Sequence, residues 1–349
     1  MSKAVSRPVS KPTNRTDYTM KKASNLRLLT GVILLGLAST GWAADRKLVI
    51  VAGKPSHPPL MHEFNAGCIL LHKRLQDVPG LDVRLHLNGW PADATAFDGA
   101  DAVFLYMDGG GGHPAIQPQN LKLLGDLAKR GVGLGCAHFA VEVPADRGGA
   151  EFKEWIGGHY EHLYSCNPIF DAEFKSFPEH PIARGVRAFT IKDEWYFNMR
   201  FRPDMARITP ILVTVPSDDV RDGPYVYPQG PYPHIVAAKG REEIMMWAVE
   251  RADGGRGFGF TGGHFHVNWA HDDFRKVVLN ALLWLTKVDV PAGGFDSAKV
   301  TDEELLENLD PKGGPKPTLR SAAVRDDTHA CCEPLVLPRE MLAWLGMPY

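Results

Sequence analysis

The residues of this sequence best suited to chemistry are histidines that fall near the ends of expected strands. All 14 histidines lie beyond residue 43, and a subset falls where loops could converge on one sheet edge: His57, His113, His138, His159, His162, His264 and His266. A neutral imidazole can ligate zinc or a similar metal, and a histidine with an ordinary pKa near ~6.5 can act as a general acid or base. No fixed metal spacing such as His-Glu-x-x-His is present, so ordinary polar loop residues would give the same pattern.

Two carboxylates followed by aromatic residues form the second candidate feature. Asp193 and Glu194 directly precede Trp195 and Tyr196. A carboxylate beside aromatic stacking surfaces is typical of sugar sites, and either acid could complete a metal site with the histidines. A strand end with a solvated acid would look the same, so both interpretations stay open.

His264 and His266 are two residues apart and would share one face of an extended backbone. They follow a glycine pair that ends an expected strand over 256–261. Either could serve as a ligand or as an acid-base group. The tryptophans nearby, Trp269 among them, are expected in the core or in a pocket wall.

The stretch from Gly131 to Glu142 is expected to place His138 at a sharp turn. Its glycine-rich apolar run indicates a buried parallel strand in which neighbouring backbone approaches closely. Ligands bind beyond the carboxyl ends of strands in open α/β sheets, which favours a chemical role for His138. Cys136 lies two residues earlier, inside the strand, and a buried structural thiol is the favoured interpretation.

The elements that position these residues predict an α/β fold with a doubly wound, mostly parallel sheet and helices on both faces, of the flavodoxin-like type. Strands are expected over 47–52, 81–87, 101–107 and 131–137, with crossover helices over 61–76 and 117–129. Further strands are expected over 208–215, 234–239, 244–249 and 256–261, and a closing helix over 272–286.

The two ends of the chain have a different composition. Residues 1–43 are expected to be a signal peptide, with an apolar run from Leu26 to Ala38, a cleavage site near Ala43 and a true start at Met20. This predicts a periplasmic or secreted protein, with an α/β domain over 44–290 and a Pro/Gly-rich tail over 291–349. The mature chain would carry a net charge of −8, because the signal contains seven of the 39 basic residues and one of the 41 acidic residues. That charge argues against a nucleic-acid partner.

Several short segments together resemble the trehalose-utilisation (ThuA-like) family, a branch of the class I glutamine-amidotransferase-like superfamily. The segments are Gly133–His138, His180–Gly185, Lys192–Tyr196, Met246–Arg256, Gly262–His264 and Leu279–Trp284. Relative to true amidotransferases, His138 stands where their elbow cysteine is expected, and Phe265-His266-Val267-Asn268 lacks their glutamate. Glutaminase chemistry is therefore not expected, because it needs both a nucleophile and an oriented base.

The resemblance implies a role in carbohydrate metabolism, on trehalose-like disaccharides or their 3-keto derivatives, with His138, Glu194 and His264 as pocket residues. We expect these three to be catalytic groups or ligands of a divalent metal such as zinc, in a hydrolase or isomerase. A non-catalytic carbohydrate-binding module is the alternative. The residues expected to contact the substrate are His57, His113, Asp193, Trp195, Tyr196, His266 and Trp269.

Overall fold

The computed structural model describes residues 45–313, 317 and 319. The expected signal peptide over 1–43, the expected start at Met20 and the larger part of the expected tail lie outside the described residues. Among the residues described, no helix combines the length and apolar character needed to cross a membrane.

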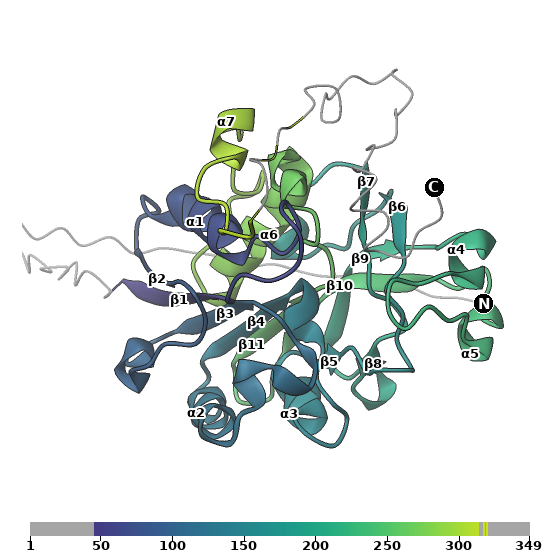
Figure 1. Ribbon diagram of the computed structural model, residues 1–349. Coiled ribbons are helices and arrows are strands. Elements are labelled where there is room, and N and C mark those ends of the chain that lie inside the picture. The colour runs from purple at the N-terminus through teal and green to yellow at the C-terminus, as the bar shows by residue number, and fades with distance from the viewer. Residues whose placement is uncertain (1–44, 314–316, 318, 320–349) are drawn as a thin grey trace, which may run out of the picture. The chain divides into compact units, whose positions relative to one another are not determined.

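The centre of the described domain is a mixed sheet whose strand order is β2-β1-β3-β4-β11-β10-β9 (Figure 1). Its strands are β1 (Arg46–Ala52), β2 (Leu81–His86), β3 (Ala102–Tyr106), β4 (Gly133–Ala137), β9 (Ile208–Thr214), β10 (Glu243–Glu250) and β11 (Arg256–Phe260). Strands β1 to β4 and β11 pair in parallel, and β10 runs antiparallel to both of its neighbours. The predicted α/β fold with a mostly parallel sheet is confirmed.

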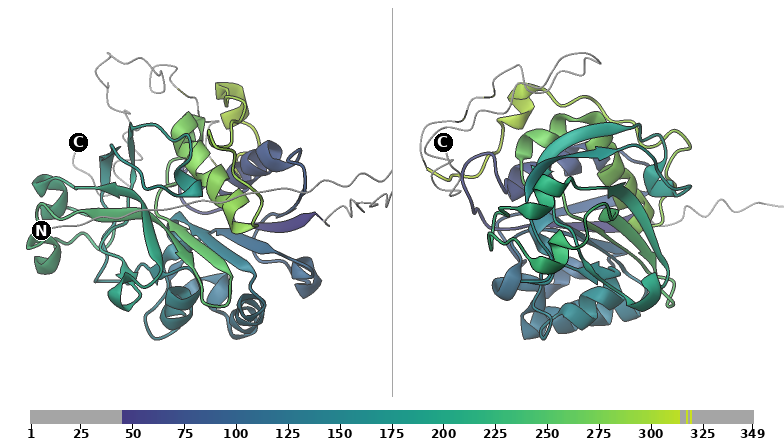
Figure 2. Two further views of the ribbon diagram at one scale, coloured as in Figure 1. Left: turned by 180° about the vertical axis from the view of Figure 1, so that it is seen from behind. Right: turned by 90° about the vertical axis from the view of Figure 1, so that its right-hand side faces the viewer.

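Helices cover both faces of the sheet, as the crossover pattern predicts (Figures 1 and 2). Helices α1 (Phe64–Leu75) and α6 (Asp272–Leu285) lie on one face, and α2 (Pro118–Lys129) and α3 (Gly149–Trp155) lie on the other. Alternate residues of β1 enter two separate cores: Leu48 and Ile50 pack with α1 and α6, whereas Val49 and Val51 pack with α2 and α3. This continuous apolar run is what a strand buried on both faces requires.

The central sheet is accompanied by two small strand pairs and three short helices. The pairs are β5 (Gly158–His159) with β8 (Arg200–Phe201), and β6 (Ile169–Phe174) with β7 (Phe189–Glu194); the helices are α4 (Asp218–Asp222), α5 (Pro233–Val236) and α7 (Asp302–Leu305). The antiparallel β6–β7 pair carries Asp193 and Glu194 at its end, opposite Phe170 and Ile169.

Two local expectations are wrong. Residues 234–239 form α5 and a turn rather than a strand, because Pro233 supplies the fixed φ angle that suits the first turn of a helix. The first helix begins at Phe64 rather than at residue 61, which leaves His62 in the preceding loop.

The described beginning of the expected tail packs against the domain. Leu305 of α7 is buried in the same core as α1 and α6, and Phe295 and Val300 pack against that core. Glu304 pairs with Arg74 of α1, with Nη2 to Oε2 at 2.6 Å. This segment therefore forms part of the α1 side of the domain.

Candidate metal centre

Four buried side chains from four separate segments converge at the carboxyl edge of the sheet. They are His62 before α1, His138 after β4, Glu194 at the end of β7 and His264 after β11, each at most 3% exposed. One ligand atom from each lies within 4.8 Å of all the others. We call these four residues the His3Glu cluster. Its composition, three imidazoles and one carboxylate, is a donor set that suits zinc and related divalent transition metals.

The turn after β4 places His138 in the cluster, as the sequence predicts. β4 lies between β3 and β11, and a Cβ at Gly135 would come within 2.4 Å of the Phe258 ring, so only glycine fits there. The strand ends at Ala137, and His138 has a φ of +52°, which is unusual for a residue other than glycine. This backbone turns the imidazole over the strand end.

A buried carboxylate beside Glu194 fixes the segment that carries His264. Asp193 Oδ1 accepts the backbone N–H groups of His264 at 3.0 Å and Phe265 at 3.2 Å, and Oδ2 accepts that of Gly263. Gly263 has a φ of +112°, which lets the chain reverse into this carboxylate. As a result, His264 Nδ1 lies 2.6 Å from Glu194 Oε2. Asp193 therefore holds in place the backbone segment that carries His264.

His62 reaches the cluster from a loop paired with the same segment. Its backbone N–H donates to the carbonyl of His264 at 3.0 Å, and the N–H of His266 donates to Leu60. His62 has a φ of +46°, so this loop is held in an uncommon conformation. The His62 Nε2 atom lies 3.0 Å from His264 Nδ1 and 3.0 Å from His138 Nε2.

The hydrogen bonds around the cluster leave ring lone pairs facing one another. His138 Nδ1 donates to the carbonyl of Thr261 at 2.9 Å, and His62 Nδ1 lies 3.2 Å from Asp108 Oδ1. Because a neutral imidazole has one N–H, both Nε2 atoms are then acceptors, although they are only 3.0 Å apart. Two acceptors at this separation repel each other unless a metal ion lies between them or one of the rings carries a second proton. The four residues therefore fit a metal ion, and Glu194, whose Oε1 accepts from Asn167 Nδ2 at 2.7 Å, keeps Oε2 for it.

The electrostatics of the cluster agree with cation binding. Burial, together with the charges of His138 and His264, lowers the pKa of His62 well below its ordinary value, so His62 is neutral. Burial opposes the charge on His138, but the hydrogen bond and charge of Glu194 outweigh it and raise the His138 pKa. Burial likewise opposes the Glu194 charge, and His264 and His138 outweigh it and lower the Glu194 pKa. A proton on His138 and a metal ion would thus compete for the same position.

Some residues expected to contact the substrate lie beside the cluster. His57 stacks on His62 with ring centroids 3.6 Å apart, and its side chain is 26% exposed, so it lies where solvent reaches the cluster. The Tyr196 hydroxyl lies 3.3 Å from His138 Nε2. The ring centroid of Tyr160 lies 5.1 Å from that of Tyr196, and its buried hydroxyl forms no hydrogen bond with the described residues.

Other residues of that set are placed in the core. His113 donates from Nε2 to the Ala140 carbonyl and accepts from the Ala115 N–H, so both ring nitrogens are used structurally. Trp195 packs against Phe174, Phe260 and Phe274, and Trp269 packs against Tyr106 and Phe274. His266 begins a 3-10 turn and is buried outside the cluster that contains His264. The structure brings none of these four into the His3Glu cluster.

Cys136 is buried in β4, and burial raises the pKa of its thiol far above the ordinary value. Such a thiol does not form the thiolate that nucleophilic catalysis needs. This arrangement agrees with the structural role expected for Cys136.

His62, Asp108 and Glu142 are among the residues of the site that sequence reasoning missed. The helix expected over 61–76 includes His62 in its first turn, and the Pro58-Pro59 pair just before it is the signal against a helix start there. Asp108 follows β3 directly, at the same sheet edge as His138. Glu142 is half-buried after the His138–Val141 turn, and burial together with the Glu194 charge raises its pKa to about 7.

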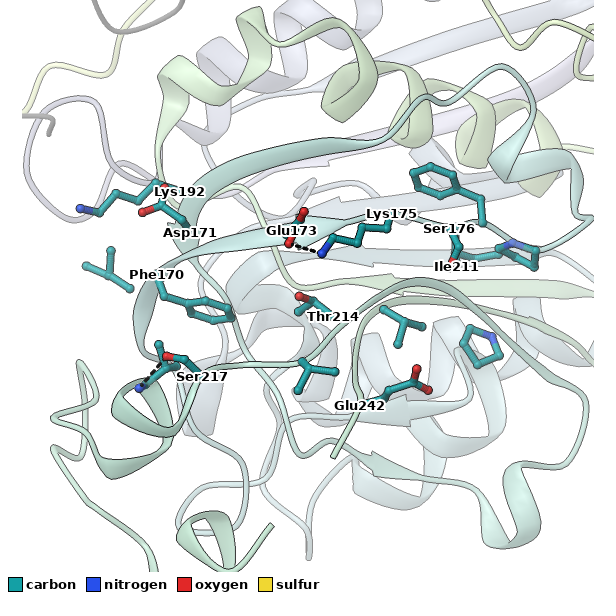
Figure 3. A pocket seen from close by; sticks show the side chains of 17 residues that line it. Phe170, Asp171, Glu173, Lys175, Ser176, Lys192, Ile211, Thr214, Ser217 and Glu242 are labelled. Carbon is teal, nitrogen blue, oxygen red and sulfur yellow. Dashed lines mark hydrogen bonds and ion pairs between the residues drawn. The ribbon is translucent and has the colours of Figure 1, made fainter. Parts of the chain in front are cut away.

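A separate groove of about 980 Å³ lies between the β6–β7 pair and the edge strand β9 (Figure 3). Its walls carry apolar residues such as Phe170 and Ile211 and an ion pair between Glu173 and Lys175. No member of the His3Glu cluster lines it.

Comparison with known proteins agrees with the resemblance stated above. Residues 85–285 match the ThuA family model, which is described as trehalose utilisation. A solved ThuA-like protein from Bacteroides uniformis is 14% identical with a TM-score of 0.50, covering 72% of this chain and 96% of that one. Another, from Parabacteroides merdae, is also 14% identical with a TM-score of 0.50, covering 75% of this chain and 99% of that one.

These structural likenesses show the fold alone, because the identities are low. No curated protein sequence matches this chain. The matched range of the family model spans more than half of the 349 residues and includes β4, His138, Glu194 and His264. The chain therefore belongs to the ThuA, or trehalose-utilisation, family.

Proposed function

We propose that this protein is a metal-dependent enzyme of carbohydrate metabolism that hydrolyses or isomerises a disaccharide or keto-sugar. The observation that carries the proposal is the His3Glu cluster, in which His62 and His138 present facing lone pairs beside the Glu194 carboxylate. Family membership supports the sugar class of substrate.

The residues of the cluster divide into ligands and the groups that orient them. His62, His138, His264 and Glu194 would hold the ion, which supplies a polarised carbonyl oxygen or an activated water when bound. The Thr261 carbonyl and the Asp108 carboxylate fix the ring orientation of two ligands, and Asn167 fixes the Glu194 carboxylate.

Proton transfer and sugar binding would fall to groups beside the cluster. A carboxyl group whose pKa is near the working pH suits a general acid-base role, and the pKa of Glu142 is raised to about 7. The hydroxyls of Tyr160 and Tyr196 are available to bond sugar oxygens, because Tyr160 has an unused hydroxyl and Tyr196 faces His138. His57 would line the entrance.

The test begins with the metal content of the mature protein, purified without a metal-binding tag. We expect near-stoichiometric zinc or another divalent transition ion in the wild type and loss of it in His138→Ala and His264→Ala. His86→Ala is the matched control, because His86 lies on the edge strand β2 outside the cluster.

Activity is then measured on trehalose, related disaccharides and their 3-keto derivatives, with the metal-loaded protein. We expect turnover in the wild type and in His86→Ala and none in the two cluster variants. Full activity in the cluster variants would contradict the proposal. Tight sugar binding in calorimetry without turnover would instead make the protein a carbohydrate-binding module.

A further inference from the structure

The loop that carries His62 is held by a segment far away in the sequence. The Lys312 side chain is 4% exposed, and its ammonium donates to the backbone carbonyls of Met61 and of His62, the latter at 3.1 Å. The same ammonium lies 3.3 Å from Glu63 Oε1, and Glu63 is fully buried. Lys312 therefore contacts His62 and both of its sequence neighbours, Met61 and Glu63.

The neighbouring residues extend this contact to the start of α1. The backbone N–H of Asp310 donates to Glu63 Oε2 at 2.8 Å, and Asp310 Oδ1 accepts from Asn65 Nδ2 at 2.5 Å. Glu63 Oε1 also accepts the Leu60 N–H at 2.8 Å. Glu63 thus connects the His62 loop to Asp310 and Lys312.

A buried ammonium placed on two carbonyls and one carboxylate restrains the backbone strongly. Charge-assisted hydrogen bonds are shorter and stronger than neutral ones, and removing one partner of a buried ion pair leaves an uncompensated charge. The restraint matters here because His62 and Leu60 both have positive φ angles, a conformation that persists only where its surroundings hold it.

We propose that Asp310 and Lys312, through Glu63, form a clamp that positions His62 as a metal ligand. This inference rests on the proposed metal centre. Both ends of the clamp lie outside residues 85–285, the range that matches the family model. The segment before the matched range thus adds the ligand His62, and the segment after it adds Lys312, which holds the His62 loop. Lys312 is a positioning residue, because it acts on the site through His62.

The test compares Lys312→Met with Glu304→Gln. Lys312→Met keeps the length of the side chain and removes its charge. Glu304→Gln is the matched control, because Glu304 belongs to the same segment and pairs with Arg74 and Lys73 but not with the His62 loop. A double variant, Glu63→Gln with Lys312→Met, avoids an unpaired buried carboxylate if the single variant does not fold.

Two quantities are measured on the full chain. The first is the affinity for Zn²⁺ by chelator competition, which we expect to fall about 10–100-fold in Lys312→Met, as for other residues that orient metal ligands, and to stay unchanged in Glu304→Gln. The second is the rate of hydrogen exchange over residues 60–66 of the metal-free protein. We expect this rate to rise at least about 10-fold in Lys312→Met and to stay unchanged in Glu304→Gln.

The outcomes separate the clamp from the metal centre. Unchanged affinity in Lys312→Met, or an equal loss in Glu304→Gln, would overturn the clamp while leaving the metal centre intact. A wild-type protein that binds no Zn²⁺ or other divalent ion would overturn the proposed centre and, with it, the role of the clamp in metal binding. Hydrogen exchange would then decide whether Lys312 holds the His62 loop at all.

Discussion

The His3Glu cluster and the groove along β9 are opposite kinds of site. The cluster offers four polar side chains, each at most 3% exposed, whose ligand atoms lie within 4.8 Å of one another. The groove offers about 980 Å³ of space, but its charged residues are exposed, and two of them, Glu173 and Lys175, pair with each other (Figure 3). Burial makes the cluster electrostatics strong, whereas water screens the charges of the groove.

This difference shows that the convergence of buried polar side chains is a better guide to a catalytic site than the volume of a groove. Desolvated polar groups are expensive, so a fold keeps four of them together only when something satisfies them. In the cluster, a cation would do so. The exposed residues of the groove need no such explanation.

The largest expected loss of metal affinity among these variants comes from removing His62, the ligand outside the range that matches the family model. In His62→Ala, we expect metal affinity and turnover to fall by at least about 10³-fold, more than the roughly 10–100-fold that residues orienting ligands contribute. The fold should persist, because Phe64 and the rest of α1 keep their core contacts. Equilibrium metal titration and circular dichroism measure the two properties. A folded variant with normal affinity would remove His62 from the centre.

A smaller loss is expected from the group that orients His62. Asp108→Asn keeps the size of the side chain but can present its N–H₂ group to His62 Nδ1, which disturbs the tautomer that leaves Nε2 free. We expect metal affinity to fall about 10–100-fold and the fold to be unchanged. Wild-type affinity in this variant would show that the bonds from His264 and the loop backbone are enough to orient the ring.

The parallel part of the fold could be predicted from sequence because its signal is local. The apolar runs of β1 and β3 and the glycine-rich β4 each indicate a buried strand, and the turn at His138 follows from where β4 ends. Local patterns made Glu194 and His264 candidates but did not distinguish them from solvated loop residues. The family resemblance is what favoured their place in a pocket.

The remainder of the site depends on contacts between distant segments. The place of His62 follows from its loop pairing with residues 264–266 and from Lys312, and neither leaves a periodic trace in sequence. Residues 234–239 show the same limit, since Pro233 favours a helix although the apolar run favours a strand. The burial of Trp195 and Trp269 likewise results from tertiary packing, which outweighs their position next to site residues.

Glu142 should produce a pH effect that the groove carboxylates do not. Its pKa is raised from an ordinary value of 4.5 to about 7, so the metal-free folded state holds this proton more tightly than the unfolded state does. The stabilisation is therefore complete below about pH 4.5 and is lost as the pH rises through about 7. Glu142→Gln, which mimics the protonated form, should gain stability relative to the wild type above pH 7, on the order of 1 kcal/mol after screening by water.

Denaturant unfolding of the metal-free protein between pH 5 and 8 measures this difference. Glu173→Gln is the control, because Glu173 is an exposed carboxylate of the groove and its pair with Lys175 contributes little. A difference between Glu142→Gln and the wild type that does not change with pH would place Glu142 in an ordinary solvated environment and remove the basis for its acid-base role.

The smallest effect is expected in the groove itself. The Glu173–Lys175 pair spans 2.8 Å with side chains 53% and 73% exposed, so Lys175→Ala should change the free energy of unfolding by no more than about 0.5 kcal/mol. Metal affinity and turnover should stay within about twofold of the wild type, because no groove residue belongs to the cluster. If turnover instead fell tenfold at unchanged metal content, the substrate would extend into the groove. The two regions would then form one site, in which the groove binds the sugar and the cluster acts on it.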